Sequence, residues 1–304
     1  MRKIKRADIE RILIVCAAAL VVVLALQSDE QTTSQVLVDQ TVIPIEQTMA
    51  EPQGETVSTV VFYRDGDGYL VPVTRQVEKT DGIAKATLNM MVKDSRNDLH
   101  AARLGLQTVI PEGTTFDIDI RDGRANVNVS KEALNCISAE EEALMVDAIT
   151  NTMACFSTVD EVTLEFDGQK RSRLTYGTDV SGVFKGGNLN LESVETFSAD
   201  AGLVQLYFPS QTGRMLVPVT RTVFSTADVS TAVLELAKGP KDDSGLERAL
   251  PEGCGVKSVT MKNGVVTVNF SSEFKQAMDA TDGGQQAVRA ILFTCAQFPG
   301  VKKV

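Results

Sequence analysis

The sequence has no tryptophan, four tyrosines and a single histidine. Sugar-binding sites rely on aromatic faces, so this composition disfavours a glycan-binding protein. The lone histidine, His100, lies in a polar stretch that we expect to be a loop. One exposed histidine predicts neither a catalytic triad nor a metal site.

Several motifs of enzymes and metal proteins are also missing. The chain contains no C-x-x-C pair, no phosphate-binding G-x-x-x-x-G-K-[ST], no G-x-G-x-x-G after a strand and no G-x-S-x-G. We therefore expect no catalytic, cofactor-binding or metal-binding residues and no enzymatic activity. Beyond Cys16, the cysteines do not repeat at equivalent positions, which predicts thiols rather than disulfides. They are Cys136, Cys155, Cys254 and Cys295.

Positive charge is scarce after the first few residues. The chain carries 30 Lys and Arg against 40 Asp and Glu, for a net charge of −10. Five of the basic residues lie within positions 1–11, so the remainder is more acidic still. Because phosphate binding needs clustered cations, this balance excludes nucleic acid as an expected partner.

An apolar run over residues 12–26 follows these basic residues and precedes Asp29 and Glu30. Cations on its N-terminal side predict a cytoplasmic N-terminus and an extracytoplasmic remainder. The run is shorter than the roughly 20 residues of a typical membrane helix. A cleaved signal peptide and a lipoprotein signal at Cys16 are therefore the alternatives. No small-residue cleavage site and no good lipid-attachment box is present, so we favour an uncleaved anchor over residues 12–27.

The most informative pattern is an internal repeat of segments in fixed order. Such a repeat predicts two copies of one small domain rather than a solenoid. The paired segments are LVPVTR at 70–75 and 216–221, PEG at 111–113 and 251–253, and VNVS at 127–130 with VNFS at 268–271.

Each copy predicts the element order β-β-α-β-β-α-β. Period-two alternation indicates the strands, helical spacing of apolar residues indicates the helices, and Ser138 with Glu141 reads as a capping box. The fold class is therefore α+β, with a mostly antiparallel sheet that carries helices on one face. The expected elements of the first copy are strands at 57–63, 69–75, 116–121, 125–129 and 162–166, with helices near 83–91 and 138–156.

These elements divide the chain into an anchored, two-domain protein. Between the two domains we expect a linker that contains a short strand at 189–194. In the second copy, residues 301–304 align with the start of the first copy's last strand. Either the chain is truncated there or another chain supplies the missing strand. The expected segments are a cytoplasmic tail (1–11), the anchor (12–27), a flexible tether (28–56), the first domain (57–168), a linker (169–202) and the second domain (203–304).

Four groups of residues invite a functional interpretation, and each has a structural one. Asp65 and Asp67 resemble a calcium loop but are typical of a hairpin turn. Glu140, Glu141 and Glu142 resemble an acidic site but favour the first turn of a helix. Pro-Glu-Gly at 111–113 and 251–253 is typical of a turn rather than a binding loop. Arg75 and Arg221 either brace the fold or face a partner, and we favour bracing.

This order of motifs resembles the GerMN domain of sporulation and spore germination, in two tandem copies. The resemblance rests on the hairpin ending VPVTR, the P-E-G turn, the D-G or N-G turn with its V-N strand, and L-A-K-G-P at 236–240. The first copy departs from the last motif with Val92-Lys93-Asp94-Ser95.

The resemblance implies an extracytoplasmic protein of endospore-forming bacteria whose modules are similar to ring-building motifs. It implies that the protein is located at the outer forespore membrane and faces the intermembrane space, and that it has a role in a transenvelope channel between mother cell and forespore. Other sporulation envelope and channel proteins would be the partners, with self-assembly an open alternative. We therefore expect a non-catalytic, membrane-anchored scaffold without cofactors; the alternative is an envelope module that binds cell-wall glycan or peptide.

Overall fold

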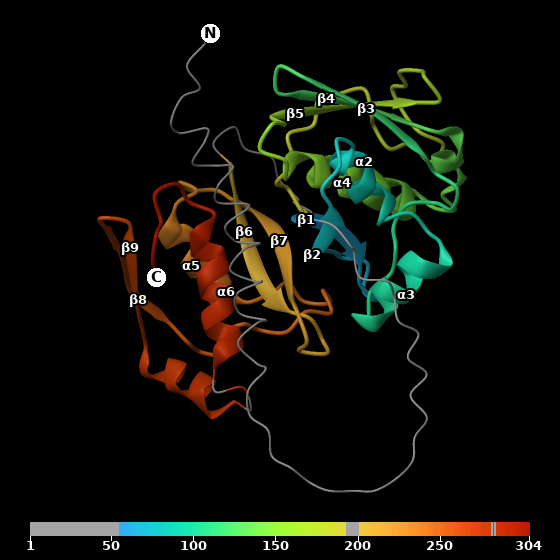
Figure 1. Ribbon diagram of the computed structural model, residues 1–304. Helices are drawn as coiled ribbons and strands as arrows, with labels where there is room; N and C mark the ends of the chain where they lie inside the picture. The colour runs from blue at the N-terminus through green and yellow to red at the C-terminus, as the bar shows by residue number, and fades with distance from the viewer. Residues whose placement is uncertain (1–54, 193–200, 281, 283) are drawn as a thin grey trace, which may run out of the picture.

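The computed structural model describes residues 55–192, 201–280, 282 and 284–304 (Figure 1). The predicted anchor at 12–27, and the predicted tether up to residue 54, lie outside the described residues. Within the part of the chain that is described, no helix is both long and apolar enough to cross a membrane.

The first module has the predicted element order with one additional helix. Strands and helices alternate as β-β-α-α-β-β-α-β, and a short 3₁₀ turn, Lys131–Asn135, precedes the longest helix. The elements are β1 (Thr56–Arg64), β2 (Leu70–Glu78), α2 (Ile83–Asn89), α3 (Ser95–Arg103), β3 (Phe116–Arg121), β4 (Arg124–Val129), α4 (Ala139–Ala154) and β5 (Glu161–Phe166).

The second module has the order β-β-α-β-β-α, without an equivalent of α3 in the described residues. The final strand is represented in the described residues by one parallel bridge between Val265 and Lys303. A 3₁₀ segment, Ser272–Asp279, again precedes the last helix. The elements are β6 (Gly202–Pro209), β7 (Leu216–Val223), α5 (Val229–Lys238), β8 (Val256–Lys262), β9 (Val265–Phe270) and α6 (Gln285–Ala296).

The prediction of one mostly antiparallel sheet per module is wrong. In the first module β1 and β2 form a separate hairpin, and β3, β4 and β5 form a second sheet in which β4 and β5 are parallel. The parallel pair arises because α4 connects β4 to β5, and a helical crossover returns the chain in the same direction.

Helices α2 and α4 of the first module, and α5 and α6 of the second, lie between the two sheets of their module, rather than on one face of a single sheet (Figure 1). Helix α4 contacts β1 on one side and β5 on the other, and α5 contacts both β6 and β8. Such a helix is buried around most of its circumference. Accordingly, Met145, Ile149 and Met153 are fully buried, while small or polar residues such as Ala148 and Thr152 complete the buried surface.

The two hairpins correspond strand by strand. LVPVTR lies in β2 and in β7, and Arg64 pairs with Leu70 as Pro209 pairs with Leu216. This pairing makes Pro209 the equivalent of Arg64 and, along the same strand, Gln205 the equivalent of Val60. The tight turns between the later strands also match, because Asp122 and Gly123 have positive φ in one module and Asn263 and Gly264 in the other.

His100 lies on helix α3 and not in a loop, which corrects the sequence expectation. The helix begins after Asp94, whose carboxylate accepts hydrogen bonds from the backbone N–H groups of Arg96 and Asn97. The side chains of α3 are mostly polar, and only Ala101 among them is fully buried. The sequence therefore shows no helical spacing of apolar residues that would predict this helix. Burial, with the charge of Arg75 and two further arginines, lowers the pKa of His100 below its usual value.

No disulfide links the four cysteines of the described residues. Cys295 is completely buried, as is Met153, which the repeat places at the equivalent position of the first module. Burial raises the pKa of Cys295 to about 12 and that of Cys136 to about 11. These side chains therefore act as small apolar residues of the core.

Candidate interaction site at the junction of the two modules

The first feature of the junction is the linker, which is held to the first module by a buried carboxylate. Glu142, in the first turn of α4, is 1 % exposed. It accepts hydrogen bonds from the backbone N–H groups of Tyr176 and Thr178, at 2.9 and 3.0 Å. Further along, the side-chain oxygen of Asn151 accepts a 2.8 Å bond from the N–H of Gly187. The linker thus follows α4 towards the second module and packs on the first module.

The three consecutive glutamates of α4 do not form one acidic site. Glu140 forms an ion pair with Arg64 at 2.9 Å, while Glu142 binds the linker. Ser138 caps the helix by accepting from the N–H of Glu141, as predicted. The carboxylate of Glu141, however, accepts from the N–H of Ile137 rather than completing a capping box at Ser138. The helix interpretation is correct, and each carboxylate has a different partner.

Asn190 is the residue at which both modules meet. Its Oδ1 accepts a 2.8 Å hydrogen bond from the N–H of Leu70 in β2. Its Nδ2 donates to the carbonyl of Leu70 at 2.9 Å and to that of Pro218 in β7 at 2.7 Å. The backbone of Asn190 has a φ of 51°, a left-handed conformation that asparagine tolerates better than most residues. One side chain therefore joins the two LVPVTR segments.

The linker backbone adds to the edge of β7. Leu191 forms a parallel bridge with Thr220, whose N–H donates to Leu189 and whose carbonyl accepts from Glu192. The hydroxyl of Thr220 also donates to the carbonyl of Leu189, at 2.7 Å. The expected strand over 189–194 is therefore not formed as predicted: residues 189–190 make a turn, in which Asn190 has a left-handed backbone, and only Leu191 pairs with β7. Residues 193–194 lie outside the described residues.

The β1–β2 turn makes a second contact between the modules. The hydroxyl of Tyr69 donates a 2.8 Å hydrogen bond to the carbonyl of Ser244. The turn is organised by Asp65, whose Oδ1 accepts from the N–H groups of Asp67 and Tyr69. Burial raises the pKa of Asp65 above its usual value. The hairpin-turn interpretation is confirmed, and the turn serves as part of the junction.

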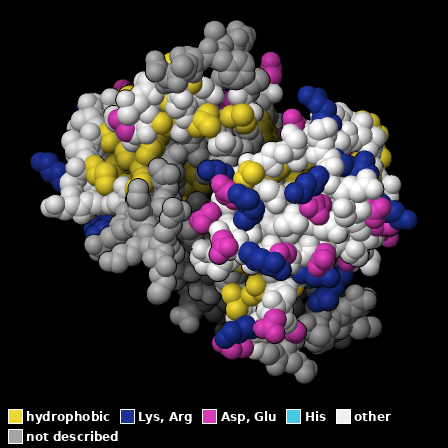
Figure 2. All heavy atoms as spheres, turned by 90° about the horizontal axis from the view of Figure 1, so that it is seen from above, with side chains coloured by type: hydrophobic (Ala, Val, Ile, Leu, Met, Phe, Trp, Pro, Cys, Tyr) yellow, Lys and Arg dark blue, Asp and Glu magenta, His cyan; other side chains and the backbone are white. Residues whose placement is uncertain are grey.

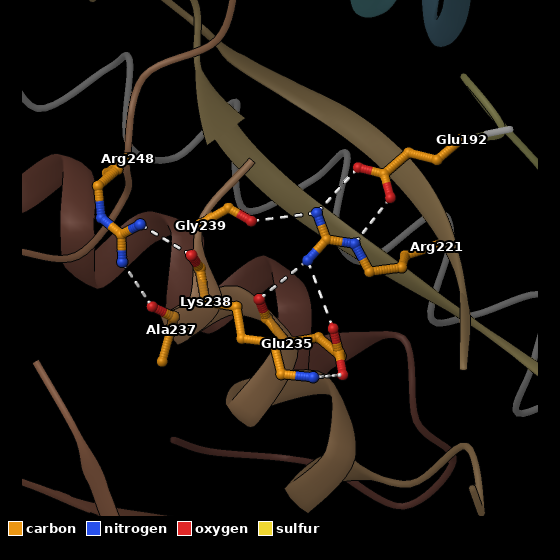
Figure 3. A network of polar contacts seen from close by, with 7 residues as sticks. All are labelled: Glu192, Arg221, Glu235, Ala237, Lys238, Gly239 and Arg248. Atoms are coloured by element: carbon orange, nitrogen blue, oxygen red, sulfur yellow. Dashed lines mark hydrogen bonds and ion pairs between the residues drawn. The ribbon is translucent and has the colours of Figure 1, made fainter. Parts of the chain in front are cut away.

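Arg221, the last residue of the second LVPVTR segment, lies at the centre of a buried ion network (Figure 3). Its guanidinium binds Glu192 of the linker through two bonds of 2.7 and 2.9 Å, and Glu235 of α5 at 3.4 Å. The side chains of Arg221 and Glu192 are 11 % and 10 % exposed. Burial lowers the pKa of Arg221, but the two carboxylates outweigh it and raise the pKa above its usual value. The predicted bracing role of Arg221 is confirmed.

The L-A-K-G-P segment ends α5 beside this network. Arg221 donates to the carbonyls of Glu235 and Gly239, and Arg248 donates to those of Ala237 and Lys238 (Figure 3). Two guanidinium groups thus satisfy the open carbonyls of the helix end. Gly239 has a φ of 91°, and a side chain there would collide with Arg248. In the first module the amide of Asn97 fulfils this role by donating to Asn89 and Val92.

A hollow of about 430 Å³ lies in the first module, between the Pro-Glu-Gly turn and the start of α4. Arg64, Lys93, Glu112 and Glu141 supply its charges, and its lining contains no aromatic ring. Thr114 closes the turn by donating to the carbonyl of Pro111 at 2.7 Å, so the turn interpretation of Pro-Glu-Gly is confirmed. The balanced charges do not favour a ligand of one sign.

The other candidates of the sequence do not converge. His100, Asp65 and the Pro-Glu-Gly turns lie on separate elements, and no group of three His, Cys, Asp or Glu residues in the described ranges is placed to hold a metal ion. Asn190 was missed by sequence reasoning, because the strand expected over 189–194 assigned its side chain no role. Its only signal is a position between two leucines in the linker.

Comparison with known proteins identifies the modules. A family model described as Germane, sporulation and spore germination, matches residues 60–172 and 205–304, one stretch in each module. The chain belongs to the Germane family. The sequence resemblance to this sporulation and germination domain is thereby confirmed, and so is its duplication.

GerM of Bacillus subtilis matches most of the chain, both in sequence and in a solved structure. The spore germination protein GerM of strain 168 is 30 % identical over 266 residues, which cover 84 % of this chain and 72 % of the relative. The solved structure of the tandem GerMN domains of the sporulation protein GerM matches with a TM-score of 0.68 and 27 % identity. That match covers 82 % of this chain and 89 % of the solved one, so it includes both modules.

Proposed function

We propose that this Germane-family protein is a non-catalytic, membrane-anchored scaffold in sporulation or spore germination. In this role its two modules lie outside the cytoplasm, facing the space between mother cell and forespore. There they help to assemble or stabilise a transenvelope channel complex between the two cells. Other envelope and channel proteins of sporulation are its partners.

The observation that carries the proposal is the junction. Asn190, Glu142 and Arg221 attach the linker to both modules through buried or half-buried polar contacts. A linker held in this way keeps the modules in one orientation, whereas an exposed, polar linker would let them move independently. A fixed pair of modules suits a scaffold, since it presents two surfaces at a constant spacing to its partners.

The surface of the two modules supports a role in assembly. Hydrophobic side chains gather over the second module, on the left of Figure 2, while cations and anions are interspersed over the first module on the right. The second module exposes large apolar side chains, among them Phe224 at 59 % and Leu234 at 46 %. The first module also exposes an apolar side chain, Ile137 at 78 %, and pairs charges on the outer face of its three-stranded sheet, such as Arg124 with Glu161. Exposed apolar groups of this kind are typical of surfaces that contact other proteins.

The proposal is tested by deleting the gene in its spore-forming host and scoring heat-resistant spores. A fluorescent fusion to the full chain reports its position. We expect a block after engulfment and fluorescence that rings the forespore. Normal spore yield together with uniform envelope fluorescence would overturn the proposal.

A complementation arm isolates the junction. The deletion strain receives the wild-type chain, Asn190→Ala or Asn188→Ala, each checked for equal abundance by immunoblot. We expect Asn190→Ala to restore fewer heat-resistant spores than the wild type, and Asn188→Ala to restore them fully. Asn188 is exposed, and its side chain forms no hydrogen bond with another described residue, so it is the matched control. Full rescue by an abundant Asn190→Ala chain would show that a fixed module orientation is not required.

A further inference from the structure

Strand β1 has one edge that faces away from its partner β2. Arg64 exchanges two backbone hydrogen bonds with Gln107, which shows that the backbone N–H and C=O of Arg64 point away from β2. Because strand residues alternate, the N–H and C=O groups of Phe62, Val60, Ser58 and Thr56 point the same way. The N–H of Phe62 meets the sulfur of Met91 at 3.2 Å.

The remaining stretch of this edge, from Thr56 to Val60, is unpaired within the described residues. The backbone groups of Thr56, Ser58 and Val60 that point away from β2 form no hydrogen bond with another described residue. Thr56 and Ser58 are exposed, and Val60 is half-buried. An unpaired edge of this kind is a template for another strand.

The second module contains the same edge in a closed form. There Gln205 is the equivalent of Val60, and the side chain of Gln297 occupies its edge. The N–H of Gln205 donates to Oε1 of Gln297 at 2.8 Å, and Nε2 of Gln297 donates to the carbonyl of Gln205 at 2.6 Å. One amide side chain thus imitates a neighbouring strand and blocks the edge.

The first module lacks this device. By the repeat alignment, Cys155 stands at the position of Gln297, and a thiol side chain has no amide to place against the strand. Charged edge residues, which many proteins use to prevent pairing, are also missing. No charged residue occurs from Thr56 to Tyr63, so a neighbouring strand would bury no charge.

We propose that the β1 edge is a self-association surface, which pairs antiparallel with β1 of a second copy of this chain. The pairing is centred on Ser58, so that Ser58 faces its own copy and Thr56 faces Val60 of the other chain. A second copy fits because this arrangement is self-complementary: it is uncharged, has the smallest side chain at the symmetry axis and has β-branched residues on either side. This inference is independent of the sporulation role, since it concerns assembly of the chain with itself.

The register is tested by cross-linking the full chain, purified in mild detergent. In a pair centred on Ser58, the two residues at this position exchange backbone hydrogen bonds, so their Cβ atoms lie about 5.5 Å apart, too far for an unstrained disulfide. Ser58→Cys should therefore give a covalent dimer with a short bis-maleimide cross-linker, which spans that gap. Gln76→Cys is the matched control, since Gln76 is the exposed partner of Ser58 on β2, away from the edge. No dimer from Ser58→Cys, or equal dimer from both variants, would overturn the proposal.

Sedimentation velocity tests the edge itself and does not depend on cross-linking. We expect the wild-type chain to dimerise with rising concentration and Ser58→Pro to dissociate, at about tenfold weaker affinity for each hydrogen bond lost. The proline removes only an N–H that points away from β2. Circular dichroism confirms that this variant is folded. A wild-type chain that stays monomeric at all concentrations would overturn the proposal.

The two modules also allow a reciprocal exchange of the blocking side chain. Cys155→Gln should close the β1 edge and weaken dimerisation, and Gln297→Ala should open the β6 edge and increase association. If Cys155→Gln is folded and dimerises as the wild type does, or if Ser58→Cys cross-links in cells only to a different protein, a second copy is not the occupant.

Discussion

Asn190 and Leu70 lie 120 positions apart in the chain and exchange two hydrogen bonds, from N–H to Oδ1 at 2.8 Å and from Nδ2 to the carbonyl at 2.9 Å. The same amide also donates to Pro218. An amide side chain has both a donor and an acceptor, so Asn190 satisfies the edge of β2 as a neighbouring strand would. The two copies of LVPVTR are thereby held against one linker residue.

Asn190→Ala should destabilise the protein by about 2–3 kcal/mol, because three hydrogen bonds are lost. Alanine also tolerates the left-handed backbone poorly, so Asn190→Gly serves as a second variant that removes the side chain without this strain. Urea unfolding of both variants should show two transitions, one for each module, in place of a single one. Unchanged, single transitions would mean that other contacts couple the modules.

Arg221→Ala should cost about 3–5 kcal/mol, since it leaves Glu192 buried without a cation and Glu235 paired only with Lys238. Arg75, at the equivalent position of the first LVPVTR segment, is the natural control. It is half-buried and forms no ion pair within the described ranges, so Arg75→Ala should cost about 1 kcal/mol or less. Chemical denaturation of both variants measures the difference, and equal losses would contradict a special role for the network at Arg221.

Glu142→Gln should destabilise the folded state by about 2 kcal/mol. The amide replaces one of the carboxylate oxygens that accept from Tyr176 and Thr178 with a donor group, and a buried N–H then lacks its acceptor. Glu140→Gln is the control two residues away. Its carboxylate is 59 % exposed beside Arg64, where an ion pair contributes little. Thermal melting should separate the two variants, and early proteolysis within residues 172–188 should accompany the loss in Glu142→Gln.

The thiols should respond to pH in a way that follows from their burial. At pH 8, a thiol whose pKa is about 11, as for Cys136, should alkylate about 100-fold more slowly than in the unfolded chain, and Cys295 more slowly still. Cys155, which is half-exposed, should react first among the thiols in the described ranges. Mass spectrometry after timed alkylation checks the order; rapid modification of Cys295 in the folded protein would contradict its burial.

The same two thiols set the direction of a stability change at alkaline pH. Their folded pKa values lie above the unfolded value of 9.0, so the unfolded chain loses these protons first. Their contribution is fully present below pH 9 and is lost as pH rises from 9 towards 12. Cys295→Ser, whose hydroxyl does not titrate in this range, should show a shallower decline of unfolding free energy between pH 9 and 11.

The elements that the sequence predicted well are those with local causes. The turn at Asp122 and Gly123, the alternation in β3 and β4 and the first turn of α4 depend on neighbours within a few positions, so they are visible in one chain. Helix α3 was not predicted because its only local signal is the Asp94 cap, which no stripe of apolar residues follows. The division of each module into two sheets was not predicted, because alternation of apolar residues identifies a strand but not the strand that pairs with it.

The sequence by itself determined the duplication, the hairpins and the family resemblance, because each is carried by residues adjacent in the chain. The tertiary structure decided the rest. A hydrogen bond between Asn190 and Pro218, or between Gln297 and Gln205, depends on the path of the intervening chain, which no short pattern encodes. The repeat of LVPVTR can therefore be recognised in the sequence, whereas its position at the junction of the two modules follows only from the fold.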